Sequence, residues 1–414
     1  MPGRRRPLRH HGGVLPTPPG VEELRQIALA AGLDALGVAR AEPFLSTRAD
    51  LESRRAEGLA ADMAFTYRNP ERSTSPERLL RNARSLVVGA RNYHRHQPPR
   101  PIAPADTTAL ADTTAPADTG PADTAGPVGA THPEHLGQVG RYAWEDHYAA
   151  LRQGLEAVSQ RLRAHGFRAA VFLDGNHLVD REAAYRAGLG WYGKNTNLLV
   201  GERGSWFVLG SVVTDADLPA DEVQADGCGS CRRCLDACPT GALPRPGVLD
   251  ANRCLAWLAQ RPGLFPLEHR VALGARIYGC DDCQTVCPPN RRDEQRVALR
   301  TTTAPTQGAW VPLLELLAAP DEDVLQRWGH WYLAERRPFA LRRNALLALG
   351  NTAQGTDPRV VAALQRHLQD PDPLLRATAV WAARRLGLAE LAATAATDPD
   401  ATVRQELAEA VKVR

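Results

Sequence analysis

Hydrophobic positions near the start of the chain recur at helical spacing. Val21, Leu24, Ile27 and Ala28 lie three, three and one positions apart, which predicts an amphipathic helix that is followed by an apolar strand over residues 35–39. The same patterns predict helices over 50–68, 76–84, 147–165 and 180–187, and strands over 85–90, 169–173 and 206–214. Helices that alternate with strands in this way indicate a layered α/β or α+β structure, and we expect an α+β chain with an α/β N-terminal domain.

The periodic pattern stops between residues 98 and 133. The composition there narrows to Ala, Asp, Thr, Pro and Gly, and the triplet Ala-Asp-Thr recurs at Asp106, Asp112, Asp118 and Asp123. Such a segment cannot bury enough apolar surface to offset the entropy of ordering it. We therefore expect 98–133 to be a disordered insert in the first domain, without a catalytic role.

A repeated pattern occupies the C-terminal part of the chain. The segment 341–345 (Leu-Arg-Arg-Asn-Ala) is echoed by segments that begin at Leu375 and Val403, and Asp-Pro-Asp precedes the last two. Asp-Pro ends one helix and begins the next, and repeats of roughly 30–40 residues are typical of helical solenoids. The pattern predicts HEAT-like helical repeats.

Arg342, Arg376 and Arg404 occupy the same position in each repeat. They would align along one face of a small solenoid. Two interpretations stay open: a face that is merely solvated, and a stripe that binds phosphate groups.

Length and charge limit the class of protein. The chain has 414 residues, with 50 Lys and Arg against 47 Asp and Glu and a net charge of +3, so overall charge does not by itself indicate a nucleic-acid partner. A chain of this length is too long to fold around a single hydrophobic core. We expect three domains, over residues 21–225, 226–292 and 300–414. No apolar run approaches the roughly 20 residues of a membrane span, and none follows the basic tail at Arg4–Arg6, so we expect a cytoplasmic protein without membrane association.

All eight cysteines lie between Cys228 and Cys287. The first four follow the spacing C-x2-C-x2-C-x3-C-P, a lone Cys254 comes next, and C-x2-C-x3-C-P begins at Cys280. This run is the bacterial signature of two [4Fe–4S] clusters, in which the fourth cysteine ligates the other cluster. Structural zinc sites use two C-x2-C pairs separated by a longer gap, not three cysteines in one tight loop. Disulfide frameworks are typical of secreted and mostly smaller proteins. Both interpretations therefore explain the eight cysteines less well than two clusters do.

Exchange of the fourth ligand divides the thiolates into two sets of four. One predicted set is Cys228, Cys231, Cys234 and Cys287, and the other is Cys238, Cys254, Cys280 and Cys283. An apolar stretch over 264–277 separates Cys254 from Cys280. We expect a ferredoxin-like domain that has accepted a helical insertion.

Three further segments carry a family resemblance. They are Leu-Asp-Gly-Asn-His-Leu-Val-Asp-Arg over 173–181, Ala-Gly-Leu-Gly-Trp-Tyr-Gly-Lys-Asn-Thr over 187–196, and Arg-Ile-Tyr-Gly-Cys-Asp-Asp-Cys-Gln over 276–284. Together with Arg-Tyr-Ala over 141–143, they resemble epoxyqueuosine reductases, the cobalamin-dependent iron–sulfur enzymes of the last step of queuosine synthesis in tRNA. The resemblance runs from about residue 22 to 290, and helical repeats also occur in some members.

The resemblance implies an activity and its partners. Electrons from a low-potential donor would pass through the two clusters to cob(II)alamin, which would lie between the N-terminal domain and the clusters. The reduced cofactor would act on epoxyqueuosine at the wobble position of a tRNA anticodon stem-loop, and we expect the enzyme to be a monomer. Asp174 matches the proton donor of the family, and the matched cobalamin contacts are Arg141, Asp174, Lys194, Asn195 and Ser205.

The residues themselves allow plainer interpretations. Asp174 follows an apolar strand and could only cap the turn, whereas Asp180 has the position of a helix cap. Glycines at 188, 190 and 193 would let the backbone approach a flat ligand. Lys194 is one of two lysines in the chain. The chain departs from the family after Asp174, where it has Gly-Asn-His, and after Cys254, where two family hydroxyls are absent.

Two other functions compete with this one. A cobalamin and iron–sulfur reductase of another substrate, such as an organohalide, would share the cofactors, but those enzymes normally carry a twin-arginine export signal and lack the repeats. A non-enzymatic electron carrier or helical-repeat scaffold would bind no corrin. Retention of added cobalamin distinguishes the scaffold from both enzymes.

Overall fold

A computed structural model describes residues 17–63, 67–95, 135–300, 308–411 and 413. The predicted insert over 98–133 and the basic N-terminal tail lie outside these residues. The chain forms two compact units: one from Met1–Gly58, Met63–Tyr93 and His147–Ser230, the other from Leu59–Asp62, His94–Asp146 and Cys231–Arg414. Each unit is described by itself.

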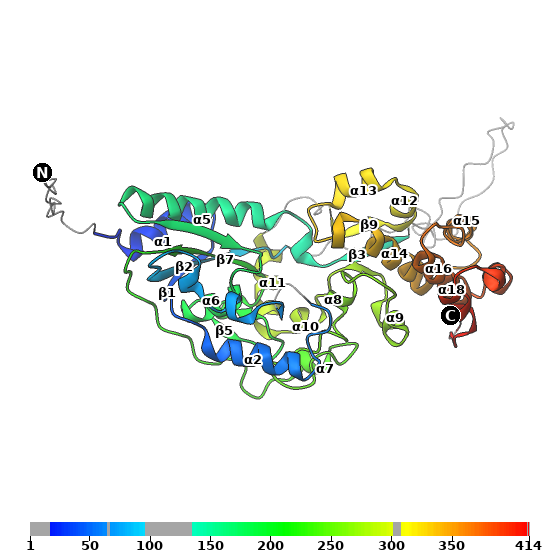
Figure 1. Cartoon of the computed structure of the whole chain (residues 1–414), viewed down its shortest axis with the longest axis horizontal. Coiled ribbons are helices and arrows are strands. Elements are labelled where there is room, and N and C mark those ends of the chain that lie inside the picture. Colours follow the sequence, from blue (N-terminus) through cyan, green and yellow to red (C-terminus); the bar gives the residue numbers. More distant parts are fainter. Residues whose placement is uncertain (1–16, 64–66, 96–134, 301–307, 412, 414) are drawn as a thin grey trace, which may run out of the picture. The chain divides into compact units, whose positions relative to one another are not determined.

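The first unit is built on a four-stranded sheet (Figure 1). Its strand order is β1 (Ala35–Arg40), β2 (Ser85–Asn92), β7 (Phe207–Thr214) and β4 (Ala169–Leu173). Every neighbouring pair is antiparallel. The α+β class is thereby confirmed, and the strands that flank helices in sequence do not form a parallel sheet.

Helices cover both faces of this sheet. Helices α1 (Val21–Ala30) and α5 (His147–Ala164) pack together on one face, and α6 (Asp180–Arg186) packs on the other (Figure 1). The buried side of α5 follows helical spacing, which explains why its period was readable in the sequence. Its large apolar residues there are Leu151, Leu155, Val158 and Leu162. A small hairpin, β5 (Trp191–Tyr192) and β6 (Leu198–Leu199), completes the unit.

Two helix predictions are wrong in their bounds. The segment predicted as a helix over 50–68 forms α2 from Leu45 to Ala56, and turns follow it, with Gly58 at φ +75°. The segment over 76–84 contains only the single turn η1 (Pro76–Arg78). Before it, Asn69 caps α4 (Pro70–Ser73) by accepting from the Arg72 N–H. Caps and prolines divide the region, and these local signals override helix propensity.

The second unit combines a small sheet with the cysteine-rich region. Strand β3 (Leu136–Val139) lies between β8 (Arg276–Tyr278), which is parallel to it, and β9 (Trp310–Pro312), which is antiparallel. The predicted insertion helix over 264–277 is only partly correct. Helix α9 (Leu267–Leu273) ends at Gly274, whose φ of +60° favours glycine, and the rest enters β8.

The C-terminal repeats are confirmed as helices. After α12 (Leu313–Ala318) and α13 (Asp321–Trp328) come α14 (Phe339–Thr352), α15 (Pro358–His367), α16 (Pro373–Arg385), α17 (Ala389–Ala393) and α18 (Ala401–Ala408). Helices α14, α16 and α18 pack side by side in that order. The aspartates at the starts of α16 and α18 each accept a backbone N–H, as the Asp-Pro-Asp pattern predicts, and Asp357 caps α15 in the same way.

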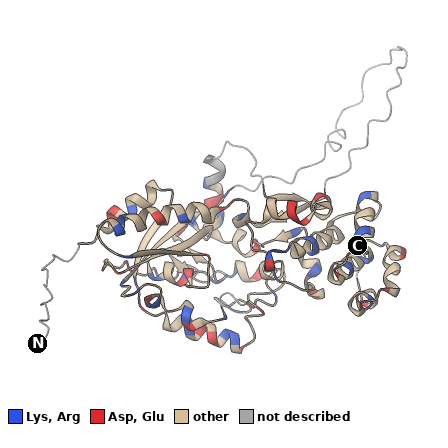
Figure 2. Ribbon diagram, turned by 45° about the horizontal axis from the view of Figure 1, so that its top comes forward, with Lys and Arg blue, Asp and Glu red and all other residues tan. Residues whose placement is uncertain are grey.

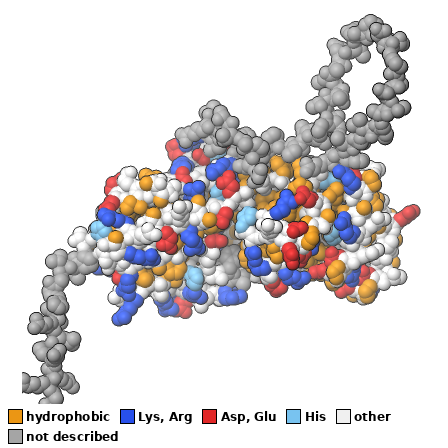
Figure 3. All heavy atoms as spheres, turned by 90° about the horizontal axis from the view of Figure 1, so that it is seen from above, with side chains coloured by type: hydrophobic (Ala, Val, Ile, Leu, Met, Phe, Trp, Pro, Cys, Tyr) orange, Lys and Arg blue, Asp and Glu red, His pale blue; other side chains and the backbone are white. Residues whose placement is uncertain are grey.

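Charged side chains of both signs are interspersed over the ribbon of each unit (Figure 2). The face drawn in Figure 3 shows the same mixture, with apolar side chains between the charges. Within the described parts of the chain, no helix has both the length and the apolar character to cross a membrane.

Candidate active site

The sheet of the first unit brings several predicted residues to one end. Because β2 and β4 run opposite to β7, the segments that follow β2 and β4 lie at the same end as the segment that precedes β7. Asp174 follows β4, Tyr93 follows β2, and Ser205 precedes β7. The backbone N–H of Tyr93 donates to the Trp206 carbonyl at 2.9 Å, which closes this end of the sheet.

Asp174 begins an exposed turn. Its φ of +46° lies in the left-handed region, which Asp and Asn adopt more readily than most other residues with a Cβ. Gly175, Asn176 and His177 continue the exposed segment. His177 contacts the Arg72 guanidinium at 2.7 Å and packs edge-on against the Phe172 ring. Asp174 is therefore exposed at this end of the sheet.

Asp180 differs from the cap that its sequence position suggests. The N-cap of α6 is Val179, which makes no side-chain capping bond, and Asp180 is the first helical residue. Its carboxyl group lies near the backbone of Asp174. Burial raises the pKa of Asp180 well above its usual range, and the Asp174 carboxylate raises this pKa further. The two aspartates form one electrostatic unit.

Three phenols surround Arg181. Burial raises the pKa of Tyr148, Tyr192 and Tyr67, and the Arg181 charge lowers each of these pKa values in part. The nearby carboxylates of Asp174 and Asp180 also raise the pKa of Tyr148. The phenols therefore stay protonated at neutral pH, and that of Tyr148 can serve as a hydrogen-bond donor near Asp174.

Arg181 and Tyr148 were not predicted as site residues. Arg181 was visible only as the last letter of the segment over 173–181. Tyr148 carried no signal, because its role depends on where α5 packs against the sheet.

The other predicted residues of this unit lie near the β5–β6 hairpin. Lys194 Nζ donates to the Gly229 carbonyl at 2.5 Å, in the loop that follows Cys228. Asn195 is buried and its Oδ1 accepts the Asn197 N–H at 3.3 Å, which shapes the turn of the hairpin. Ser205 is buried as well. Lys194 therefore holds a loop that carries a predicted cluster ligand.

The glycines of the hairpin were expected to let the backbone approach a flat ligand. The structure gives a different reason for two of them. A Cβ at Gly190 would lie 1.8 Å from the Leu199 carbonyl oxygen. Gly188 has φ +68°, and a Cβ there would lie 2.4 Å from the Glu222 carbonyl oxygen. At both positions the close approach is to the chain's own backbone, so these two glycines need no flat ligand to explain them.

Cys228 belongs to the first unit, and the other seven cysteines belong to the second. In the second unit, α7 (Arg233–Asp236) and α10 (Asp282–Thr285) pack against each other. Each of these short helices carries a central cysteine of its motif, Cys234 and Cys283. The two cysteine motifs thus form a quasi-repeated pair, as their spacing predicts.

Four thiols of the second unit act on one another. Burial raises the pKa of Cys283 well above its usual range, and Cys280, Cys254 and Cys238 raise it further. Burial likewise raises the pKa of Cys280 to about 12. Buried thiols that repel one another as thiolates suit a cationic iron site, which holds them deprotonated. The structure thus brings together the four residues of the second predicted ligand set.

Among the described residues, no three His, Cys, Asp or Glu side chains converge closely enough to form a site for one metal ion.

Arg141 lies in the second unit, beside the cysteine loop. Its backbone N–H donates to Asp281 Oδ2 at 2.8 Å, and its guanidinium pairs with Glu294 at 3.0 Å. Asp281 lies between Cys280 and Cys283. Burial raises the pKa of Asp281, and the Arg141 N–H and charge oppose that shift. Arg141 therefore supports the loop that carries two predicted ligands.

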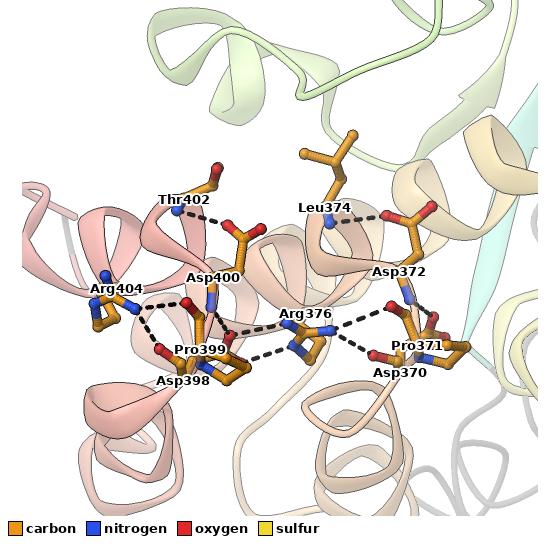
Figure 4. A network of polar contacts seen from close by, with 10 residues as sticks. All are labelled: Asp370, Pro371, Asp372, Leu374, Arg376, Asp398, Pro399, Asp400, Thr402 and Arg404. Carbon is orange, nitrogen blue, oxygen red and sulfur yellow. Dashed lines mark hydrogen bonds and ion pairs between the residues drawn. The ribbon is translucent and has the colours of Figure 1, made fainter.

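The aligned arginines of the repeats have a third role, which neither open interpretation included. Arg376 pairs with Asp398 at 2.7 Å and donates to the carbonyls of Asp370 and Pro371, and Arg404 donates to the carbonyls of Asp398 and Pro399 (Figure 4). Arg342 similarly donates to the Ala319 carbonyl and pairs with Asp321. Arg376 and Arg404 thus hold the turn that precedes their own helix, and Arg342 holds the turn between α12 and α13.

An antiparallel α+β domain, a paired cysteine motif and helical repeats together define an iron–sulfur protein with a separate polar site on its sheet. Residues 227–290 match the 4Fe-4S double cluster binding domain, and residues 328–412 match HEAT repeats. An epoxyqueuosine reductase of Bacillus anthracis is 32% identical over 88% of this chain and 90% of its own length. One of Bacillus subtilis is 32% identical over 88% and 87%. The chain belongs to the epoxyqueuosine reductase family.

Solved structures agree with this assignment. One is a crystal structure of an epoxyqueuosine reductase with a tRNA-Tyr epoxyqueuosine-modified stem loop. Its superposition on this chain has a TM-score of 0.78 and 30% sequence identity, and includes 94% of this chain and 96% of that chain. A Bacillus subtilis structure with a TM-score of 0.75 and 30% identity covers the same shares, and is described with its catalytic aspartate loop swung out of the active site.

Proposed function

We propose that this protein reduces epoxyqueuosine at the wobble position of tRNA to queuosine. The observation that supports this proposal is the similarity to epoxyqueuosine reductases over nearly the whole chain. One relative of known structure is bound to an epoxyqueuosine-modified stem loop. In this reaction the epoxide accepts two electrons and two protons, loses its oxygen as water and leaves a carbon–carbon double bond. We expect the enzyme to act as a monomer in the cytoplasm, where its proposed substrate is found.

Two [4Fe–4S] clusters fit the donor set of the second unit. The proposed ligands are Cys228, Cys231, Cys234 and Cys287 for one cluster, and Cys238, Cys254, Cys280 and Cys283 for the other. When bound, clusters of this type supply electrons at low potential, reaching roughly −700 mV. An external low-potential donor would refill them. The Cys238 thiol accepts the Ala242 N–H at 3.2 Å, a contact of the kind that tunes cluster potential.

Cobalamin is the proposed second cofactor, held by Arg141, Asp174, Lys194, Asn195 and Ser205. It would supply a strongly reducing and nucleophilic cobalt centre. The described residues contain a buried polar group that fits a ligand here: Trp191 Nε1 lies in the hairpin beside Lys194 and has no hydrogen-bond partner in the described part of the chain. The Gly227 backbone lies close against the same indole ring.

Asp174 is the proposed proton donor to the oxygen that leaves the substrate. Its carboxyl group is exposed at the end of the sheet, where a substrate can reach it. A free Asp titrates near 3.9, so donation at neutral pH requires surroundings that disfavour its charge. Bound corrin and substrate would supply such surroundings by excluding water from Asp174.

The experiment is a direct assay of the nucleoside. Anaerobically reconstituted protein, hydroxocobalamin and a chemical reductant are incubated with an epoxyqueuosine-containing stem loop, and the digested nucleosides are analysed by mass. Conversion to a product with one oxygen atom less supports the proposal. Unchanged epoxyqueuosine in the presence of bound corrin and reduced clusters overturns it, and turnover of an aryl bromide alone would indicate the organohalide reaction instead.

A further inference from the structure

We propose that His177 is a positioning residue. Through its hydrogen bond with Arg72 it holds the turn that carries Asp174 against helix α4, and protonation of its ring releases the turn. The proposal rests on the proposed function only for the role of Asp174 as proton donor. The contact itself belongs to the first unit and can be tested without substrate.

The Asp174 turn is anchored at both ends and exposed at its tip. Before the turn, Leu173 is paired with Gly210 in the sheet. After it, Leu178 is buried and the Val179 N–H donates to the Ser73 carbonyl at 3.0 Å. Residues 174–177 between these anchors are exposed. An exposed tip between fixed ends can move locally without disturbing the sheet or α6.

The His177 imidazole contacts the chain on both sides of Asp174. Its ring meets the Phe172 ring edge-on, with 5.7 Å between the ring centroids. On the other side of Asp174, a Cβ added at Gly175 would lie 3.5 Å from His177 Cδ2, so the imidazole lies close to the backbone there. The ring thus bridges the residues that flank the proposed proton donor.

Arg72 joins this ring to α4. Its Nη2 lies 2.7 Å from His177 Nδ1. The Arg72 backbone is fixed, because its N–H donates at 3.0 Å to Oδ1 of Asn69, the residue that caps α4. The next residue of α4, Ser73, holds the far end of the turn through its carbonyl. Two neighbouring residues of one short helix therefore hold both the tip of the turn and its end.

The direction of the hydrogen bond between Arg72 and His177 follows from the chemistry of the two groups. A guanidinium can only donate, so His177 Nδ1 accepts, and the ring is neutral with its proton on Nε2. A second proton on Nδ1 removes the acceptor and places two cations in contact. Histidine is the side chain whose charge ordinarily changes between about pH 5 and 8. The contact therefore holds the turn at higher pH and releases it as pH falls.

The other charged groups of α4 and α6 have partners of their own. Glu71 pairs with Arg78 at 2.8 Å, Glu182 pairs with Arg186 at 2.7 Å, and the Arg181 charge lowers the pKa of Asp180, which the Asp174 carboxylate raises. The Phe172 ring from β4 adds no charge. Arg72 is the charged group in contact with the imidazole, so a proton on the ring acts most directly on Arg72.

Substitutions of both partners test the contact. His177→Phe keeps an aromatic ring but offers no acceptor, and Arg72→Ala removes the donor. The double variant shows whether the two side chains act together. His165→Phe is the matched control, because His165 Nδ1 contacts the Thr17 carbonyl at 3.1 Å elsewhere in the same unit. Hydrogen–deuterium exchange of residues 174–177, expressed as protection relative to an unfolded peptide, is measured at about pH 5.5 and 8 for the cofactor-loaded full chain.

We expect His177→Phe and Arg72→Ala each to lower the protection of the turn at the higher pH by about 2- to 10-fold, the scale of one hydrogen bond. The double variant should lose no more protection than either single variant. The wild type should lose protection by a similar factor between the higher and the lower pH, whereas His177→Phe should not. His165→Phe should behave as the wild type. In single-turnover assays with modified stem loop, the advantage of the wild type over His177→Phe should shrink at the lower pH.

Equal protection of the wild type and His177→Phe at the higher pH would overturn the proposal. Additive losses in the double variant would do the same, as would a wild-type turn whose protection does not change with pH. If His177→Phe does not fold, Arg72→Ala decides in its place, because without the guanidinium the turn should no longer respond to pH. Exchange needs no substrate, so these outcomes are distinct from a failure of the proposed reaction.

Discussion

Asn344 in α14 donates from Nδ2 to the carbonyl of Ile277 in β8 at 2.8 Å, and from the same nitrogen to the Ala259 carbonyl at 2.7 Å. The neighbouring Arg343 is fully buried and donates to the carbonyls of Leu258, Arg261 and Gly263. Burial lowers the pKa of Arg343 to about 9. Two polar residues of the first repeat thus complete the backbone hydrogen bonds of the cysteine-rich region.

Asn344→Leu should destabilise the second unit. The substitution leaves two buried carbonyls unpaired and removes an acceptor from Arg343, so we expect a loss of about 3 kcal/mol in unfolding free energy. Denaturant titration followed by circular dichroism measures it. Gln365→Ala, at an exposed position of α15, is the control and should change stability by less than about 0.5 kcal/mol. Equal stability of the two variants would show that the hydrogen bonds of Asn344 do not stabilise the second unit.

Asp174→Asn should separate chemistry from binding. The amide cannot donate a carboxylic proton, so turnover should fall by about 10²- to 10⁴-fold while the visible spectrum of the clusters and retention of corrin stay unchanged. Single-turnover assays with modified stem loop, together with gel filtration of the corrin complex, measure the two properties. Turnover within threefold of the wild type would remove Asp174 from its role.

Cys238→Ala should damage more than one cluster. Cys238 is assigned to one cluster but belongs to the loop that holds the other, so its loss should release at least half of the iron. Iron content and the visible absorbance of the reconstituted protein measure this. Thr240→Ser is the matched control, because it keeps the hydroxyl that donates to the Arg253 carbonyl at 2.6 Å. Full iron content in Cys238→Ala would refute the ligand assignment.

Arg376→Gln should weaken the repeats in a pH-dependent way. The Arg376 guanidinium donates to Asp398 and lowers the pKa of that carboxyl. A carboxyl whose pKa is lower in the folded state stabilises the fold above its unfolded pKa, and this contribution disappears as pH falls through the folded pKa. The variant should lose about 1.5–3 kcal/mol at pH 7, and the difference from the wild type should shrink below about pH 4. Unfolding curves at several pH values test both statements.

Gly190→Ala should prevent the β5–β6 hairpin from closing. The added Cβ would meet the Leu199 carbonyl oxygen at 1.8 Å, and backbone cannot yield as a side chain can. We expect a loss of about 3 kcal/mol or more, among the larger single-site effects. Gly20→Ala, where a Cβ would meet no atom within 4 Å, is the control. A stable, cofactor-binding Gly190→Ala protein would show that the hairpin can move.

Predictions from the sequence were correct where a residue and its neighbours in the chain are enough to determine the local structure. Strand β4 has the predicted bounds, Ala169–Leu173, because a compact run of apolar residues is bounded by polar ones. The predicted helix over 50–68 was wrong in its bounds. The helix ends before Gly58, and Asn69 caps a separate short helix further along the chain. The interpretations of the repeat arginines failed differently: the spacing was correct, but Arg376 and Arg404 bind carbonyls of the turn before their own helix, a local contact that the residue pattern does not show.

The cysteine spacing was sufficient to predict two [4Fe–4S] clusters, in agreement with the match to the double cluster binding domain, and the division of the eight ligands stays a prediction. The family segments were likewise sufficient to nominate Asp174. The electrostatic influence of Asp174 on Asp180, that of Arg181 on three phenols and the role of Asn344 could be seen only in the folded chain. Each of them joins groups on different elements, and such distances depend on how a sheet and its helices pack, which no local pattern encodes.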